Sequence, residues 1–261
     1  MRILVAIKQV ISPDLPANLF EIDPVELRQR ADRLPLVASV YDEHALEVAL
    51  QLRDRHGASV AVVTVGGEPA VKVLRKALAM GAGDAIRIDP AGVDDRDPAV
   101  AAALLAEVTM RQAAGLLLCG CQSADWGWEQ TGPLAAEILG WPCVTFASAV
   151  EQSGDALLVT RPTIDGREVL RVRVPAVITI TSGEGNLPRL AQVRAVLHAE
   201  RQPIQVLYAG KDLAGRAPWP SARIVDLCLP ASRSTCVMVE GEGPAEQARQ
   251  LVAALQQRRL I

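Results

Sequence analysis

The sequence predicts an α/β protein in which helices cover a doubly wound, mostly parallel sheet. Two observations carry this prediction. Short runs of Val, Ile, Leu and Ala, such as residues 2–10 and 59–65, are typical of strands buried on both faces of a parallel sheet. These runs alternate with helical segments across short connections, which is the pattern of a doubly wound fold.

The first half of the chain contains the clearest alternation. Gly57 and Gly81 follow helical segments, where glycine adopts the conformation that closes a helix. The proline-containing excursion at 12–35 is expected to hold one short helix at 25–32. The predicted strands are 2–10, 59–65, 85–88 and 116–119, and the predicted helices are 42–57, 68–80, 98–114 and 130–139.

The second half has shorter strands, predicted at 144–150, 157–160, 169–174 and 176–180. Turn residues at 153–155 and 165–166 separate them, so we expect a small antiparallel extension. Beyond it, residues 187–201 are weakly amphipathic, 203–223 are rich in Pro, Gly and Arg, and 244–261 repeat apolar residues with a helical period.

These patterns predict three parts. A Rossmann-like nucleotide-binding core with its antiparallel extension occupies residues 1–184. An arm and linker that leave the compact body occupy 185–223, and a C-terminal arm whose helix packs either on this chain or on a partner occupies 224–261.

Charge and cysteine content restrict the partners and the compartment. Lys and Arg number 27 against 30 Asp and Glu, so no overall charge attracts the chain to nucleic acid or an anionic membrane. No window approaches the roughly 18 apolar residues that a membrane-spanning helix needs, and the N-terminus does not read as a secretory signal. The odd number of cysteines, 5, argues against a disulfide framework, so we expect a cytoplasmic protein without membrane insertion.

Motifs for several enzyme classes are missing. The sequence has neither a Gly-x-Gly-x-x-Gly loop after residues 2–10 nor a P-loop, which disfavours ordinary dinucleotide dehydrogenases and ATPases. It also lacks a serine nucleophile elbow and a zinc-binding motif, so we expect no catalytic residue and no metal site. Cys119 and Cys121 are interpreted as a reduced structural pair, and His44 and His56 as surface residues.

Residues 120–133 are the strongest candidate for a functional site. They leave the carboxyl end of predicted strand 116–119 and enter helix 130–139, which is where open α/β sheets bind ligands. Small residues let backbone N–H groups approach a phosphate, the helix N-terminus adds positive charge, and Ser123 and Thr131 offer hydroxyls. A nucleotide site and an ordinary surface loop fit these features about equally well.

Several segments, in order through nearly the whole chain, share a pattern with one known family. They are residues 4–10, 41–43 with 45–47, 75–82, Gly120 with Gln122 and Asp125, 130–132, 141–148 and 170–179. The block Ala-Leu-Ala-Met-Gly-Ala together with Val-Pro-Ala-Val-Ile-Thr is specific in combination. The chain therefore resembles the β subunit of electron transfer flavoprotein, including its nitrogen-fixation-associated homologues.

The resemblance implies an αβ heterodimer that carries electrons from flavin-dependent dehydrogenases to a quinone reductase or another acceptor. In that family the α subunit mainly holds the redox-active FAD, and the β subunit buries AMP or, in bifurcating members, a second FAD. Carried over, the nucleotide contacts are Ala6, Ser39, Val40, Tyr41, Asp42, Val65, Gly120, Cys121, Gln122, Ser123, Ala124, Asp125, Trp126, Gly127, Trp128, Glu129, Gln130 and Thr131.

The loop departs from the family pattern at its centre. The family usually has Lys where Cys121 stands, and small or acidic residues where Trp126, Gly127 and Trp128 stand. Two of the four Trp of a chain with only 3% aromatic residues therefore lie inside the expected nucleotide loop. We expect this member to differ from its relatives in ligand or partner there.

The resemblance also assigns the two arms. The family segment that inserts a Leu into partner dehydrogenases aligns with residues 187–201 and places Val193 at the anchor position. Arg194, His198 and Arg201 follow where the family is rich in lysine, and residues 244–261 match the arm that wraps the α subunit. From the residues alone, the basic positions of this segment, including Arg189, fit an acidic-partner patch or a solvated helix face.

Two other functions compete with the electron carrier. One is a nucleotide-sensing or ATP-hydrolysing domain of related fold, although the last third offers only Gly183 and Gly185 as elements of a Gly-rich phosphate motif. The other is a scaffold whose nucleotide site is degenerate.

Overall fold

A computed structural model describes residues 1–31, 34–213, 224–229 and 236–261 of the chain. The described residues belong to two units, Met1–Val225 and Asp226–Ile261. Parts of the expected linker, 214–223, and of the expected C-terminal arm, 230–235, lie outside the described residues.

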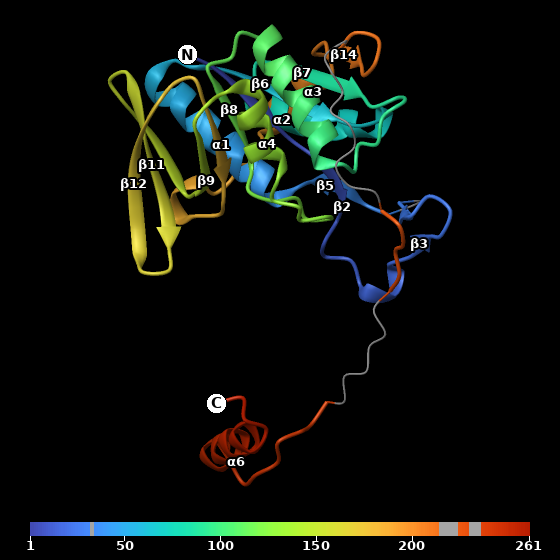
Figure 1. The fold of residues 1–261 in the computed structure, drawn as a ribbon, viewed down its shortest axis with the longest axis vertical. Coiled ribbons are helices and arrows are strands. Elements are labelled where there is room, and N and C mark those ends of the chain that lie inside the picture. The colour runs from blue at the N-terminus through green and yellow to red at the C-terminus, as the bar shows by residue number, and fades with distance from the viewer. Residues whose placement is uncertain (32–33, 214–223, 230–235) are drawn as a thin grey trace. The chain divides into compact units, whose positions relative to one another are not determined.

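The first unit is built on a parallel sheet with the strand order β14-β7-β6-β1-β8-β13-β9 (Figure 1). All of its pairings are parallel, and the chain reverses direction across the sheet between β1 and β8. The predicted doubly wound fold is confirmed. Its strands are β1 (Arg2–Ala6), β6 (Ser59–Val65), β7 (Asp84–Asp89), β8 (Leu116–Gly120), β9 (Cys143–Ala147), β13 (Ala176–Ile180) and β14 (Gln205–Tyr208).

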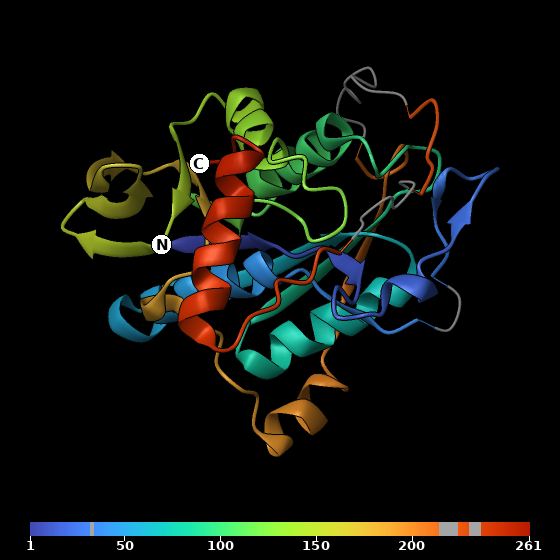
Figure 2. The ribbon, with the colours of Figure 1, turned by 90° about the horizontal axis from the view of Figure 1, so that it is seen from below.

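Helices cover both faces of this sheet (Figure 2). Helices α1 (Val40–His56) and α2 (Val71–Met80, preceded by the 3-10 turn η2 at Glu68–Ala70) pack on one face, and α3 (Pro98–Arg111) and α4 (Thr131–Leu139) pack on the other. Each ends within a few residues of its predicted position. Alternate side chains of the strands supply two aliphatic cores, such as Val5 and Val62 on the first face and Leu4 and Val63 on the second.

The first predicted strand is two strands. Only β1 belongs to the parallel sheet; the chain then leaves it, and β2 (Gln9–Ile11) pairs antiparallel with β5 (Leu36–Ala38), which the sequence did not reveal. The short helix expected at 25–32 is also wrong. Described residues there form a turn and a two-stranded hairpin of β3 (Ile22–Asp23) and β4 (Arg28–Gln29), where the Asp23 carboxylate accepts the N–H groups of Val25 and Glu26.

The antiparallel extension is confirmed but smaller than expected. It contains β10 (Ala149–Ser153), β11 (Ala156–Thr163) and β12 (Gly166–Arg173), joined in that order. The expected strand 144–150 splits into β9 and β10 at Ser148, because β9 pairs with β13 in the main sheet whereas β10 pairs with β11. β9 and β13 were both expected in this extension, but they run parallel to each other in the main sheet.

The arm expected after residue 185 returns to the sheet. After the 3-10 turn η3 (Glu184–Asn186), the expected amphipathic segment 187–201 contains only a short helix, α5 (Val193–Ala199), which packs on α2. Strand β14 then pairs with β7 at the edge of the sheet, so residues 205–208 are not the linker that the composition indicated.

The second unit contains helix α6 (Pro244–Gln257), close to the expected helix 244–261. Among the residues described here, none of α6 is buried. No helix in the described chain is both long enough and apolar enough to cross a membrane.

Candidate functional site

A pocket lies at the carboxyl ends of β1, β6 and β8, beside the point where the chain reverses direction across the sheet. Open α/β sheets bind ligands at such switch points, because the loops of neighbouring strands diverge there. The cavity has a volume of about 100 Å³. Its walls come from Ala6, Ile7, Lys8, Asp42, Val63, Val65, Asp95, Arg96, Pro98, Ala101, Leu105, Cys119, Gly120, Cys121, Gln122, Ser123, Trp128, Glu129, Gln130, Thr131 and Gly132.

Asp42 ties the ends of two strands together at this pocket. Its Oδ2 accepts the backbone N–H of Lys8 after β1, and its Oδ1 accepts the backbone N–H of Gly120 at the end of β8, both at 2.8 Å. Asp42 is 7% exposed, and this burial raises its pKa to about 7, although the two N–H donors and the charge of Lys8 oppose the rise. The carboxyl group therefore fixes the site through hydrogen bonds to backbone groups.

Gly120 allows the N-terminus of α1 to approach β8. A Cβ at Gly120 would lie 2.5 Å from Asp42 Oδ1 and 2.8 Å from Tyr41 Cβ, closer than real Cβ atoms come to other atoms. Gly132 plays the same part for α4, since a Cβ there would lie 2.4 Å from Thr179 Cγ2 and 2.9 Å from Cys119 Sγ. Both helix N-termini thus reach the pocket because these positions lack a side chain.

The loop between β8 and α4 is held from two directions. Ser39 Oγ accepts the N–H of Ala124 at 3.3 Å, and Lys8 Nζ pairs with the carboxylate of Asp125 at 2.7 Å. Burial would raise the pKa of Asp125, but the charge of Lys8 and its hydrogen bond hold that pKa below the ordinary value. The positive group that faces the pocket from β1 is therefore matched by a carboxylate of the loop.

The two tryptophans of the loop stack on each other. The rings of Trp126 and Trp128 have centroids 6.2 Å apart and planes only 7° apart. Gly127 between them has φ +60°, and Glu129 after them has φ +58°, a conformation that non-glycine residues rarely adopt. Trp128 lines the pocket, so a flat aromatic group forms part of its wall.

Helix α4 begins at the pocket without a side-chain cap from the described residues. The N–H groups of a helix's first turn have no partner inside the helix, and together with the helix dipole they favour an anion. In α4 these are the N–H groups of Thr131 and Gly132, since Pro133 has none. This arrangement fits a phosphate group, and Ser123 also lines the pocket.

Most of the nucleotide contacts expected from the sequence meet at this pocket. Those on its wall are Ala6, Asp42, Val65, Gly120, Cys121, Gln122, Ser123, Trp128, Glu129, Gln130 and Thr131. Those that do not line it are Ser39, Val40, Tyr41, Ala124, Asp125, Trp126 and Gly127. Of these, Ser39 and Asp125 make the contacts that hold the loop between β8 and α4.

The site also contains residues that the sequence did not single out. Lys8 lies two residues after β1, and nothing marked it as a site residue within the expected strand 2–10. Arg96 comes from the loop before α3 and donates to both oxygens of Asp94 at 2.7 and 2.8 Å, while its Nη1 donates to the carbonyl oxygen of Glu26 in the β3–β4 turn at 2.7 Å. No local motif marked it.

The two central cysteines and His56 lie where the sequence predicted, whereas His44 does not. Cys119 and Cys121 are buried and free, as a structural pair would be, and burial raises the pKa of both thiols. The expectation that His44 lies on the surface is wrong. It is buried against η3, where its Nδ1 lies 2.8 Å from the carbonyl oxygen of Asn186, whereas His56 is exposed.

A second candidate region is the exposed segment around α5. Val193, Arg194, His198 and Arg201 all lie on its surface, with Val193 77% exposed. Arg189 does not join them in one basic patch, because its guanidinium turns back to pair with Glu47 and Asp54 of α1. None of these residues lines the nucleotide pocket, so the two candidate regions are separate.

Comparisons with known proteins agree on one family. The family model described as "Electron transfer flavoprotein domain" matches residues 31–211. The electron transfer flavoprotein subunit beta of Bacillus subtilis is 33% identical, over 84% of this chain and 85% of its own length. The human subunit of the same name is also 33% identical, over 80% of this chain and 82% of its own.

A third relative belongs to a larger complex. Subunit CarD of the caffeyl-CoA reductase–Etf complex of Acetobacterium woodii is 31% identical over 100% of both chains.

Proposed function

Because this chain belongs to the β-subunit family of electron transfer flavoproteins, we propose that it works as one half of an αβ heterodimer and has no enzymatic activity of its own. Its role is electron transfer, as in the relatives named for that function. The proposed partner is an α subunit that mainly holds the redox-active FAD. Electrons enter from a flavin-dependent dehydrogenase and leave to a quinone reductase or another acceptor. The proposed location is the cytoplasm.

The pocket of this subunit is proposed to hold AMP or a second FAD. The observation that carries this is the uncapped N-terminus of α4 at the switch point of the sheet. The N–H groups of Thr131 and Gly132 and the hydroxyl of Ser123 would hold a phosphate, and Trp128 would contact a planar ring. Bound FAD supplies reversible electron transfer, whereas AMP supplies none and is structural.

The chain's own residues prepare this site. Asp42 fixes the ends of β1 and β8 relative to each other, and Ser39 holds the loop at Ala124. Lys8 neutralises Asp125, so the carboxylate does not repel a phosphate. Because Cys121 stands where the family usually has lysine and Lys8 is paired with Asp125, the N–H groups of helix α4 are the main positive groups for that phosphate.

The exposed arms are proposed to bind protein partners. Val193, Arg194, His198 and Arg201 would contact the dehydrogenase that donates electrons. The apolar positions of α6, including Leu251 and Val252, are exposed and would pack on the α subunit.

The nucleotide released from the denatured, purified heterodimer tests the pocket assignment. Mass spectrometry should find AMP, or more FAD than one per heterodimer. Asp125→Ala and Thr131→Ala should each reduce that content, because a lost buried or charge-assisted hydrogen bond costs about 1–3 kcal/mol. Asp155→Ala, in an exposed turn of the antiparallel extension, is the matched control.

Three results would contradict the assignment. ATP converted to ADP would favour the nucleotide-hydrolysing alternative, and no nucleotide beyond the FAD of the α subunit would favour a scaffold. Full nucleotide content in both loop variants would remove Asp125 and Thr131 from the site.

A further inference from the structure

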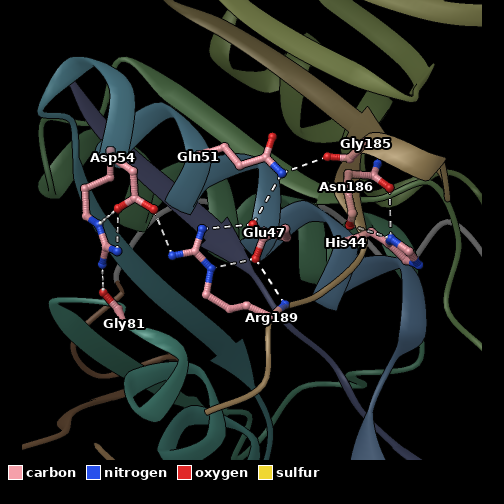
Figure 3. Close-up of polar contacts among 9 residues, drawn as sticks. His44, Glu47, Gln51, Asp54, Gly81, Gly185, Asn186 and Arg189 are labelled. Atoms are coloured by element: carbon pink, nitrogen blue, oxygen red, sulfur yellow. Dashed lines mark hydrogen bonds and ion pairs between the residues drawn. The ribbon is translucent and has the colours of Figure 1, made fainter. Parts of the chain in front are cut away.

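Helix α1 carries a stripe of polar side chains that hold the chain just before α5. His44, Glu47, Gln51 and Asp54 are three or four residues apart, so they lie along one side of the helix. Figure 3 shows them facing residues 185–189, with His44 at Asn186 and Gln51 donating to the carbonyl oxygen of Gly185 at 2.8 Å. The segment that leads to α5 is thus attached to the helix that begins at the pocket.

Arg189 makes the strongest of these attachments. Its Nε and Nη2 donate to the two carboxylate oxygens of Glu47 at 2.8 and 2.9 Å, and its Nη1 donates to Asp54 Oδ2 at 2.8 Å. The backbone N–H of Arg189 also donates to Glu47, at 3.2 Å. Such a two-pronged contact fixes direction as well as distance, because the guanidinium is planar.

A second arginine holds the other end of α5. Arg75 of α2 donates to the backbone carbonyl oxygens of Ala199, the last residue of α5, and of Gln202. The chain between Arg189 and Arg75's contacts is therefore fixed at both ends on neighbouring helices of one face of the sheet.

Between these two attachments several apolar side chains are exposed to solvent. Leu190 is 94% exposed, Val193 77% and Leu197 65%. The arginine contacts therefore hold an apolar surface in one orientation without covering it. A surface ordered before binding spares a partner the cost of ordering it.

We propose that Arg189 is a positioning residue for docking of the flavin-dependent dehydrogenase: its contacts with Glu47 and Asp54 present Leu190 and Val193 in the orientation that the donor binds. This rests on the proposed function, in which the α5 segment contacts the donor. Arg189 itself acts through the segment and does not touch the redox groups.

The test uses the αβ heterodimer with a flavin-dependent dehydrogenase from the same organism that reduces it. We expect Arg189→Ala to raise the KM for the heterodimer about tenfold, with kcat and flavin content unchanged. Hydrogen exchange should become faster in residues 190–199 only. Arg189→Lys should restore part of the KM, since lysine keeps the charge but loses the fork. Arg53→Ala is the matched control, because Arg53 also pairs with Asp54 but donates to the carbonyl oxygen of Gly81.

Val193→Ala separates this inference from the proposed function. If Val193→Ala leaves the KM unchanged, the segment is no docking surface, and both the proposed docking role and the inference fail. If Val193→Ala raises the KM but Arg189→Ala changes it no more than Arg53→Ala does, only the inference fails. Loss of flavin or a lower kcat at constant KM in Arg189→Ala would mean that Arg189 supports the fold alone, which also overturns it.

Discussion

Helix α1 serves two regions with two carboxylates that are stabilised in opposite ways. At the pocket, both oxygens of Asp42 accept backbone N–H groups, and burial raises its pKa to about 7. Five residues later Glu47 is just as buried, but its hydrogen bonds from Arg189 outweigh that burial and hold its pKa below the ordinary value. At the pocket, the carboxyl group of Asp42 is held by backbone N–H groups. Further along the helix, Glu47 forms an ion pair with Arg189 and so holds a segment that projects into solvent.

The two regions need different kinds of contact. A pocket requires strand ends at a fixed close spacing, and a short carboxyl group bonded to two N–H groups provides it. A projecting segment has little packing of its own, so a longer and stronger contact must replace the missing burial. Four substitutions test this contrast, and they are described in decreasing order of the stability change expected.

Gly120→Ala should break the pocket end most severely. The added methyl group would meet Asp42 Oδ1 at 2.5 Å and Tyr41 Cβ at 2.8 Å, and such overpacking costs up to about 3 kcal/mol. Urea unfolding measures the loss. Gly115→Ala, at the other end of the same strand, has open space around the new atom and should change the unfolding free energy by less than about 0.5 kcal/mol. Equal stability of the two variants would show that the close approach is not required.

Asp42→Asn should cost about 2 kcal/mol at pH 5, because an amide accepts at only one of the two positions that face N–H groups. The cost should shrink as pH rises to 8. Folded Asp42 keeps its proton up to about pH 7, whereas the unfolded chain loses it near 3.8, so the natural protein loses stability from this group across that window. Asn has no such loss. A cost that grows with pH would contradict the raised pKa.

Glu47→Gln should cost about 1 kcal/mol at pH 7, since the contact with Arg189 is partly exposed. Its pH dependence has the opposite sign. The lowered pKa of Glu47 adds stability above about pH 4.5 that disappears as pH falls, so the variant and the natural protein should converge once the pH falls below that lowered pKa. Glu168→Gln, which removes the exposed pair with Arg161, is the control and should have almost no effect at any pH.

Leu190→Ser should leave the unfolding free energy within about 0.5 kcal/mol, because the side chain is 94% exposed. Urea unfolding of both variants measures this. Leu50→Ala, at a buried position, is the reference and is expected to lower the unfolding free energy by about 3 kcal/mol. A large loss in Leu190→Ser would mean that the segment packs against the protein after all.

The central sheet was predictable because its strands are local apolar runs. The composition of Ser59–Val65 and Leu116–Gly120, rich in Val and Leu, indicates buried strands without reference to the rest of the fold. Strand β14 was not, since Gln205, Val206 and Tyr208 are exposed and the strand exists only through pairing with β7. The break between β9 and β10 at Ser148 has little local signal, because apolar residues stand on both sides of it. Tertiary pairing decided both.

The candidate site divides in the same way. Residues 120–131 form one continuous segment at a strand end, so their meeting at the pocket follows from general rules of α/β sheets. Arg96 and Lys8 reach the pocket from separate loops, and only the three-dimensional fold brings them together. His44 was misplaced because its helix position looks polar, whereas η3, distant in sequence, covers it.

The exposed segment before β14 has a consequence for how such a chain can change over generations. Leu190, Val193 and Leu197 project to solvent, while the fixed parts of the segment are the arginine contacts at its two ends. Substitutions at the projecting positions therefore carry almost no penalty for the fold. Under the proposed docking role, substitutions at these positions would let the chain accommodate a different electron donor without a loss of fold stability.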